Sequence, residues 1–290
     1  MITKSRGEKF FDVLLYVVLA CSVVMIFYPF LHVLSISFSD RGEALRAGFH
    51  FYPRSVSLEA YAQILDATSL WRAYGNTLFR MVLGTAAALT VTILAAYPLS
   101  KSYFPLKRMF LLLILFTMLF EGGIIPTYLL LKELDILNTR GVYIVLHMAN
   151  AFHVLVMITF FRSIPRELEE AARIDGASEL KTLYRVILPL TIPVVATIGL
   201  WNLVAHLNMF MDNLLYVTDR SKFVLQQILQ EILIEDRQDS FADIALSEEP
   251  PTPESLKMAS IIVSITPMLL LYPFMLRYFE KGVMVGSVKG

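Results

Sequence analysis

Side chains that could bind a polar solute gather in one apolar segment, which reads WNLVAHLNMFMDNLLYV over residues 201–217. Polar groups inside a membrane span are costly and tend to face the interior of a helix bundle, where they mark a pathway. Amides, an imidazole and a carboxylate beside aromatic rings are suited to hydrogen bonding and stacking against a polyhydroxylated solute. The candidates in this segment are Asn202, His206, Asn208, Phe210, Asp212, Asn213 and Tyr216.

The spacing of these residues predicts two polar stripes on one helix. At 100° per residue, Asn202, His206 and Asn213 share one stripe, while Asn208 and Asp212 share another. We expect one stripe to face a cavity. The alternative is that these groups form interhelical hydrogen bonds that only hold the bundle together.

Catalytic signatures are missing from the sequence. It contains no Gly-x-x-x-x-Gly-Lys-Ser/Thr phosphate loop, no His-Glu-x-x-His pair, no nucleophile elbow and no cysteine cluster. The five histidines show no tight metal-ligand spacing. We therefore expect no enzyme, no metal site and no cofactor in this chain, so that any ATP-driven step must take place on a separate subunit.

Composition indicates an integral membrane protein. Hydrophobic residues make up 56% of the 290 and charged residues 17%, and the mean hydropathy is +0.61. The formal net charge is zero and there is no basic tract, so a nucleic-acid partner is excluded. The apolar run that contains Cys21 continues to Phe38, which is too long for a signal peptide and predicts a first span.

Six apolar segments are long enough to cross a hydrocarbon core about 30 Å thick. They are continuous and lack the alternation of barrel strands, so the predicted fold class is an all-α membrane protein with six transmembrane helices. The segments lie near Phe11–Phe38, Trp71–Leu99, Met109–Leu131, Gly141–Phe161, Val186–Asp212 and Met258–Phe279.

The distribution of Lys and Arg predicts the orientation. Placing residues 1–10 in the cytoplasm puts 14 basic residues on that side and 10 on the other, with Arg80 inside a span. The positive-inside rule therefore predicts cytoplasmic N- and C-termini, the latter being residues 280–290. The outer loops are then 39–70 and the acidic 213–257, whose prolines in SEEPPTPES favour an extended stretch.

A charged helix is predicted on the cytoplasmic side between the fourth and fifth spans, over residues 165–177. Ser163 can cap its start, acidic residues fill its first turns, and Gly176 stands where a left-handed residue would end it. Ser178 can cap a second helix that continues into the fifth span, where Pro189 and Pro193 predict a kink.

This segment resembles the coupling motif of permeases from binding-protein-dependent ABC importers. That motif is Glu-Ala-Ala, three residues, Gly, nine residues, then Ile-x-Leu-Pro, and the sequence has Glu170, Ala171, Ala172, Gly176 and the run Val186 to Pro189, with valine for isoleucine. NTLFRMVLGT, AAYPLSK, GGIIPTYLLLKELDILNT, FFRSIPRELEEAARIDGAS and the ending LLLYPFMLRYFEKGVMVGSVKG are similar to the carbohydrate branch, of the maltose and oligosaccharide type. The resemblance covers residues 10–290.

The resemblance implies a type I importer permease fold, in a bacterial cytoplasmic (inner) membrane, whose last five spans, within residues 71–279, form the core. It implies a second homologous permease, two cytoplasmic ATPase subunits that hold ATP and Mg, an extracytoplasmic solute-binding protein and a sugar or oligosaccharide. The residues it assigns to ATPase coupling are Glu170, Ala171, Ala172, Asp175, Gly176, Ala177, Ser178, Leu188 and Pro189.

The substrate path is predicted partly from the same resemblance. Related permeases commonly have His-Trp-Asn where this chain has His206-Leu207-Asn208, which indicates a weaker stacking surface here. Asn150, His153 and Glu121 are further candidates, and three roles stay open for Glu121: a gate, a partner contact, or an interfacial acid that reaches water. Two other functions stay open: a permease for amino acids or peptides, and an ion-coupled secondary transporter.

Overall fold

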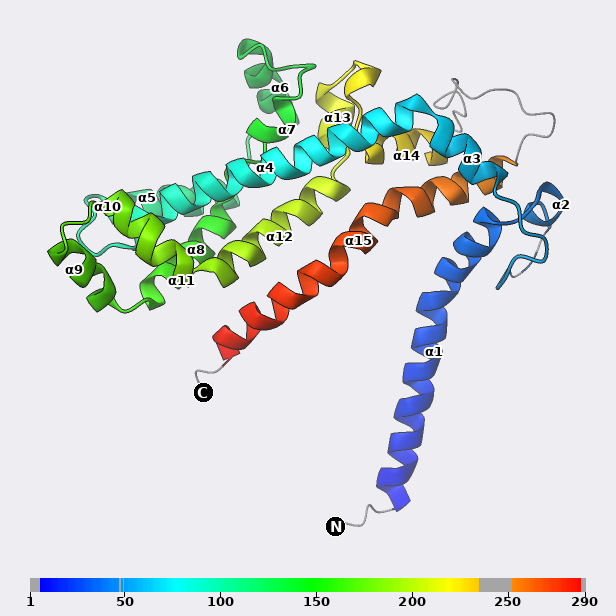
Figure 1. Ribbon diagram of the computed structural model, residues 1–290, viewed down its shortest axis with the longest axis horizontal. Helices are drawn as coiled ribbons and strands as arrows, with labels where there is room; N and C mark the ends of the chain where they lie inside the picture. Colours follow the sequence, from blue (N-terminus) through cyan, green and yellow to red (C-terminus); the bar gives the residue numbers. More distant parts are fainter. Residues whose placement is uncertain (1–5, 47, 49, 235–251, 288–290) are drawn as a thin grey trace. The chain divides into compact units, whose positions relative to one another are not determined.

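The computed structural model describes residues 6–46, 48, 50–234 and 252–287, and these are mostly helical (Figure 1). Extended pairing within the described ranges is confined to a single bridge between Ser39 and Val56. The chain divides into two compact units. One comprises Met1–Trp71 with Leu229–Thr266, and the other Arg72–Ile228 with Pro267–Gly290.

The first unit begins with one long apolar helix, α1 (Arg6–Ser37), which agrees with the predicted first span. Every side chain from residue 13 to residue 27 is exposed, and nearly all are apolar. A helix that is apolar on all sides is unfavourable in water, because every face would expose apolar surface to it. Such a helix is stable when hydrocarbon surrounds it. The short helices α2 (Arg41–Ala44) and α3 (Glu59–Asp66) follow, and the Ser37 and Tyr61 hydroxyls are 2.8 Å apart.

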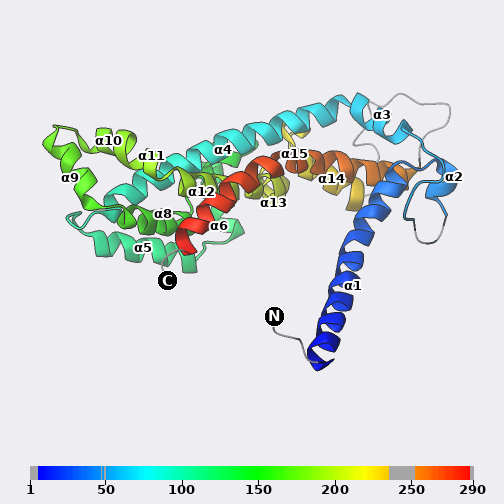
Figure 2. The same cartoon turned by 60° about the horizontal axis from the view of Figure 1, so that its bottom comes forward.

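The second unit is built on α4 (Thr68–Ser100), α8 (Ala151–Ser163) and α12 (Ile192–Asn208). Its main core joins side chains of α4, α8, α12 and a π-helical turn, η1 (Leu183–Ile187), including Tyr97, Met157, Phe161, Ile187 and Ile198. Figures 1 and 2 show α9 (Arg166–Ile174) and α10 (Glu179–Thr182) at one end of this bundle, and α13 (Met211–Tyr216) beyond the other end of α12.

The structure contains two helices that are long and apolar enough to cross a membrane, or up to four when each of two bent helix pairs counts as one span, among the described residues. The count of six spans therefore stays a prediction. The predicted sixth segment, Met258–Phe279, lies inside α15 (Pro253–Ser287). Residues 235–251 of the outer loop are outside the described ranges. The last three residues of SEEPPTPES form the start of α15, whose first residue is Pro253.

The prediction that the third span is one continuous helix is wrong. This segment consists of α5 (Lys107–Leu119) and α6 (Ile124–Glu133), bent by 115° relative to each other. Gly122 and Gly123 separate the two helices, and Gly123 has a φ of 83°, which only glycine adopts without strain. The exposed Glu121 lies in this link instead of at the end of a straight span.

The fourth and fifth predicted spans are also interrupted. The fourth consists of α7 (Val142–Val145), a turn, and α8, whose amide at His153 donates to the Asn150 side chain. The fifth bends by 83° around Thr191, between α11 (Leu188–Leu190) and α12, so the kink predicted from Pro189 and Pro193 is confirmed. It ends at Asn208, before Asp212, because α13 is a separate helix.

The outer loop predicted from residue 213 onward is largely helical where it is described. After α13, residues Arg220–Lys222 form a short 3₁₀ turn, η2, and Leu225–Ile234 form α14. The amides of Val224 and Leu225 donate to Asn213 Oδ1 and Thr77 Oγ1 at 2.8 and 2.9 Å. The start of α14 is therefore attached to α13 and α4 through buried side chains.

Close packing of α12 on α4 depends on Gly84, and this can be tested by substitution. A Cβ atom at Gly84 would lie 2.5 Å from Nε2 of the buried His206 ring. We expect Gly84→Ala to lower the thermal midpoint of the purified chain, because overpacking a core costs about 1–3 kcal/mol.

The matched control is Gly75→Ala, on the same helix, where no atom lies within 4 Å of the added Cβ. Alanine favours helix at both positions by roughly 1 kcal/mol, so only the packing differs. Equal midpoints for the two variants would show that the approach of α12 to α4 does not depend on Gly84.

Candidate functional site

The charged helix predicted from the sequence is present as α9, but its N-terminal end is not capped by the residue that was expected. The Ser163 cap is wrong: this hydroxyl donates to the Phe160 carbonyl at 2.7 Å, and Pro165 precedes α9 without a side-chain cap. Its end is as predicted, because Gly176 has a φ of 75° and the Ala177 amide donates to the Ala172 carbonyl at 2.9 Å. Ser178 caps α10 as predicted.

Two carboxylates fasten this region to the end of α4. Glu169 on α9 forms an ion pair with the buried Lys101, whose ammonium lies 3.9 Å from the centre of the Tyr97 ring. Glu179 accepts hydrogen bonds from Tyr97 and Tyr103 at 3.2 and 3.0 Å. The end of α4 and the loop that follows it therefore hold α9 and α10 in place.

Arg173 links α9 to α10 directly. Its guanidinium donates to Glu179 at 2.8 Å and to the Tyr103 hydroxyl at 3.2 Å. The hydrogen bond to Glu179 raises the pKa of Arg173, so this pair is charged at every physiological pH. The angle between the two helices is thus set by a charged network as well as by Gly176.

The outer surface of α9 is open. Ile174 is 86% exposed, which is unusual for an isoleucine at the end of a charged helix, and Leu180 on α10 is 60% exposed. A Cβ at Gly176 would meet no atom within 4 Å. Of the predicted coupling residues, Ala172, Ala177 and Leu188 are half-buried and the others exposed: Glu170, Ala171, Asp175, Gly176, Ser178 and Pro189. This face can contact another protein.

A buried polar cluster lies around Arg80, toward the other end of α4. The Arg80 guanidinium is fully buried and donates to Asp212 Oδ2 at 2.6 Å, to the Met209 carbonyl at 3.0 Å and to His206 Nδ1 at 3.3 Å. It also lies 5.2 Å from the centre of the Tyr143 ring. One side chain of α4 thus binds the end of α12, the link that follows it and the first turn of α13.

His147 completes the cluster. Its Nε2 atom is 3.4 Å from Asp212 Oδ2, and its ring meets the His206 ring edge-on at 5.8 Å. Arg80 and Asp212 provide opposite charges inside an apolar bundle, where an unpaired charge would be very costly. The cluster can fix the bend of the chain after α12, and it leaves little of either group for a solute.

The residues predicted for the substrate path do not form two stripes of one helix. His206 and Asp212 meet at Arg80, although they were assigned to different stripes, because the helix ends after Asn208. Asn213 is buried on α13, where its Oδ1 accepts from Val224. Asn208 is exposed and donates to the Val204 carbonyl at 2.9 Å.

The remaining candidates are dispersed. Asn202 is buried, donates to the Ile198 carbonyl and lies 3.3 Å from His153 Nδ1. Phe210 is half-buried, Tyr216 is buried with its ring 6.3 Å from that of Tyr128, and Asn150 caps α8. Most of these polar groups bond to backbone atoms, several of them within their own helix, while His206 Nε2 and Asn213 Nδ2 are buried without a hydrogen-bond partner among the described residues. Both solute binding and the holding of the bundle stay predictions for this set.

Sequence reasoning missed the role of Arg80. The available signal was a single arginine in an apolar helix together with a single aspartate in another apolar segment, which must pair or face water. His147 was noted only for lacking metal-ligand spacing. The described residues bring together no group of three His, Cys, Asp or Glu side chains that could hold a metal ion.

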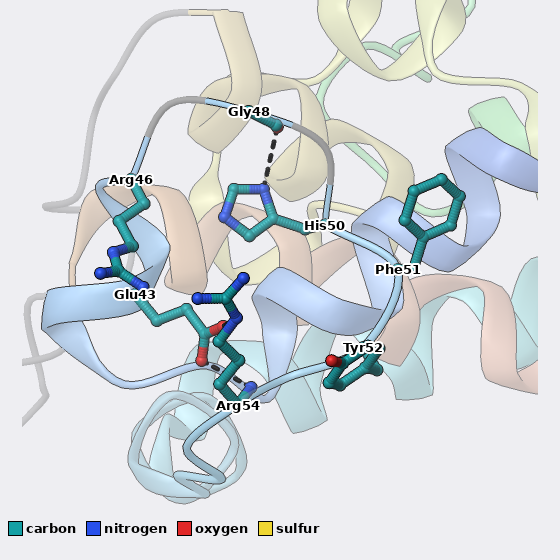
Figure 3. Close-up of a pocket in the computed structure, with 7 residues that line it drawn as sticks. All are labelled: Glu43, Arg46, Gly48, His50, Phe51, Tyr52 and Arg54. Carbon is teal, nitrogen blue, oxygen red and sulfur yellow. Dashed lines mark hydrogen bonds and ion pairs between the residues drawn. The ribbon is translucent and has the colours of Figure 1, made fainter.

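A second candidate site lies in the first unit, in the loop after α2 (Figure 3). The pocket has a volume of about 340 Å³ and is lined by Glu43, Arg46, Gly48, His50, Phe51, Tyr52 and Arg54. Burial would raise the pKa of Glu43, but hydrogen bonds from the Ser55 and Arg54 amides outweigh it and lower that pKa. Arg54 forms an ion pair with Glu43 at 3.9 Å, and the Phe51 ring packs against Tyr28 with 5.4 Å between the ring centres. Arg46 and the exposed Tyr52 are therefore the lining groups that best suit an anionic ring-shaped ligand.

The Arg80 cluster predicts a double-mutant cycle. Arg80→Leu leaves the Asp212 carboxylate buried without its main partner, so we expect it to destabilise the chain by about 3–5 kcal/mol. Combining it with Asp212→Leu removes both charges. The decrease in the free energy of unfolding of the double variant is expected to be smaller than the sum of the decreases in the two single variants. Unfolding of the full chain in detergent measures each value.

Arg140→Leu is the control for this cycle, because Arg140 is exposed, lies near the Phe79 ring and forms no ion pair with Asp212. It is expected to change stability by less than 1 kcal/mol. Strictly additive losses at Arg80 and Asp212 would contradict the pairing.

Known proteins resemble this chain over nearly its full length. Protein LplC of Bacillus subtilis (strain 168) is 36% identical over 287 residues, which cover 99% of this chain and 97% of that protein. The polygalacturonan/rhamnogalacturonan transport system permease protein YtcP of the same organism is also 36% identical, with 98% and 99% covered.

A solved structure agrees with these relatives. The crystal structure of a bacterial ABC transporter involved in the import of the acidic polysaccharide alginate has a chain that is 29% identical, with a TM-score of 0.88, covering 96% of this chain and 100% of that one. It confirms the permease fold inferred from the sequence. A family model described as a binding-protein-dependent transport system inner membrane component matches residues 3–285. The chain therefore belongs to this family of inner-membrane transport components, and it is a transport subunit and not an enzyme.

Proposed function

We propose that this chain is one of two homologous permease subunits of an ATP-driven oligosaccharide importer, and that α9 docks on a cytoplasmic ATPase. The observation that carries the proposal is the open face of α9: an exposed Ile174 and an unobstructed Gly176 stand on a helix that the bundle holds firmly from behind. A solute-binding protein on the opposite side would deliver the sugar, and ATP and Mg would bind to the ATPase pair.

The six spans of this proposal are α1, α4, the bent pair α5 and α6, α8, the bent pair that ends with α12, and α15. The excess of Lys and Arg on the side of α9 supports cytoplasmic termini. Closure of the ATPase pair on ATP would move α9, and the second unit would follow as a rigid body to turn the cavity outward.

The substrate class we favour is an acidic oligosaccharide. Two observations support it: the relatives whose names specify polygalacturonan/rhamnogalacturonan and alginate transport, and the pocket of Figure 3, which is lined by Arg46, Arg54 and Tyr52, with Arg46 on the opposite side from Tyr52. Arginine binds carboxylates through two parallel hydrogen bonds, and aromatic rings stack on sugar faces.

The docking role of α9 is tested at Gly176. A valine there must adopt a positive φ, which is strained for a β-branched residue, whereas asparagine tolerates it. We expect Gly176→Val to insert normally but to lose most sugar-stimulated ATP hydrolysis in the assembled transporter, and Gly176→Asn to keep most of it. Normal coupled uptake in the valine variant would contradict the proposal.

The substrate class is tested by uptake into cells that lack the gene for this chain, complemented with wild type or Arg46→Gln. We expect wild type to restore uptake of labelled oligogalacturonides or alginate oligosaccharides but not of maltotriose. The Arg46→Gln change should reduce this uptake several-fold, because one of two carboxylate-binding groups is removed. Restored maltotriose uptake alone would favour a neutral sugar.

A further inference from the structure

A second cationic cavity lies behind α9, within the second unit. Its volume is about 290 Å³, and it lies between the end of α4, the start of α5, the end of α8 and α9. Two carboxylates, Glu169 and Glu170, contribute to its lining. The cations that line it are Lys101, Lys107, Arg162, Arg166 and Arg173.

Three of these cations have no acidic partner among the described residues. Lys101 is paired with Glu169, and Arg173 with Glu179 outside the lining. Lys107 donates only to backbone carbonyls, those of Ser100 and Lys101 at 3.2 and 2.7 Å. The guanidiniums of Arg162 and Arg166 make no hydrogen bond or ion pair within the described ranges.

The cavity therefore carries an excess of positive charge even when Glu170 is counted. Like charges held together repel one another unless an anion binds between them. Arg162 is in the last turn of α8, while Lys107 and Arg166 are the first residues of α5 and α9. Three separate helices thus bring these cations to one place.

An apolar surface adjoins the cavity. From Lys107, α5 runs onward with Met109, Leu112, Leu113 and Phe116 all 46% or more exposed. Free phosphate would use only the cations, whereas a lipid would place its headgroup in the cavity and its acyl chains along α5. The two features together favour the lipid.

We propose that this cavity is a binding site for a phosphate-bearing anion, the headgroup of an anionic phospholipid, with Arg162, Arg166 and Lys107 as its ligands. Arginine binds phosphate in a bidentate manner, and basic pockets between transmembrane helices on the cytoplasmic side suit such headgroups. The site would anchor the base of α9 to the membrane surface.

The test uses the full chain, stripped of lipid in detergent and titrated with phosphatidylglycerol or phosphatidylcholine, with bound lipid counted by native mass spectrometry. We expect wild type to prefer phosphatidylglycerol. The double variant Arg162→Gln/Arg166→Gln should bind it about thirtyfold more weakly, since each cation near the surface contributes a factor of roughly five.

The control variant is Arg108→Gln/Arg185→Gln, which removes the same charge from exposed positions that do not line the cavity. It is expected to bind like wild type. Equal weakening in both double variants would mean general surface attraction and would overturn the proposal, as would unchanged binding in Arg162→Gln/Arg166→Gln. Unchanged thermal midpoints confirm that both variants are folded.

Inorganic phosphate distinguishes the two sources of the anion. If it displaces phosphatidylglycerol only at far higher concentration than the lipid, the acyl chains contribute as proposed. If it binds as tightly as the lipid, the site is one for a free phosphate and the lipid assignment is wrong. Co-purification of the ATPase is measured separately in the same variants, so failure of α9 docking is not confused with loss of lipid.

Discussion

The buried ion pair between Arg80 and Asp212 is the interaction on which the second unit depends. Two charges in an apolar bundle are tolerated only with close geometry and further hydrogen bonds, and Arg80 obtains these from the Met209 carbonyl and His206. The pair also explains how the chain can stop being helical after α12. The Met209 carbonyl, which the helix leaves without a partner, is bound by a guanidinium from another element.

The same helix, α4, is tied to the α9–α13 region at two distant points. At one end Arg80 holds the link after α12, and at the other Lys101 and Tyr97 hold α9 and α10 through Glu169 and Glu179. Arg80 and Lys101 are 21 positions apart along and just past the end of α4, which is roughly 31 Å or about the thickness of the hydrocarbon core. If α9 docks on an ATPase as proposed, its movement would be carried along α4 by this braced frame, which consists of α4 and its two attachments.

Local patterns in the sequence predicted what depends on neighbouring residues. The apolar length of α1, the left-handed residue at Gly176, the Ser178 cap and the kink near Pro189 all follow from short-range chemistry. The breaks at Gly123 and after Asn208 were missed although Glu121-Gly122-Gly123 and Asn208 interrupt the apolar runs there. The combined runs have the length of one span, and periodicity alone cannot show a change of direction.

The arrangement of the polar residues was the least predictable part. A stripe on a helical wheel assumes one continuous helix, and the separation of α12 from α13 removed that assumption for Asp212 and Asn213. The partner of His206 and Asp212 is Arg80, more than a hundred residues away in the sequence, and it required the fold to be known. The charged helix α9 was easier to predict because its motif is contiguous in the sequence.

The most direct measurement is the distance between spin labels at Leu168 on α9 and Leu78 on α4, two exposed positions in the second unit, in the assembled transporter with Cys21→Ser. Double electron–electron resonance would compare the nucleotide-free state with the ATP-bound state. The braced frame predicts one narrow distance distribution that is the same in both states, while labels placed across the two permeases move. A shift of the 78–168 distance larger than the width of the distribution would show that α9 moves independently of the frame, and the account would be wrong.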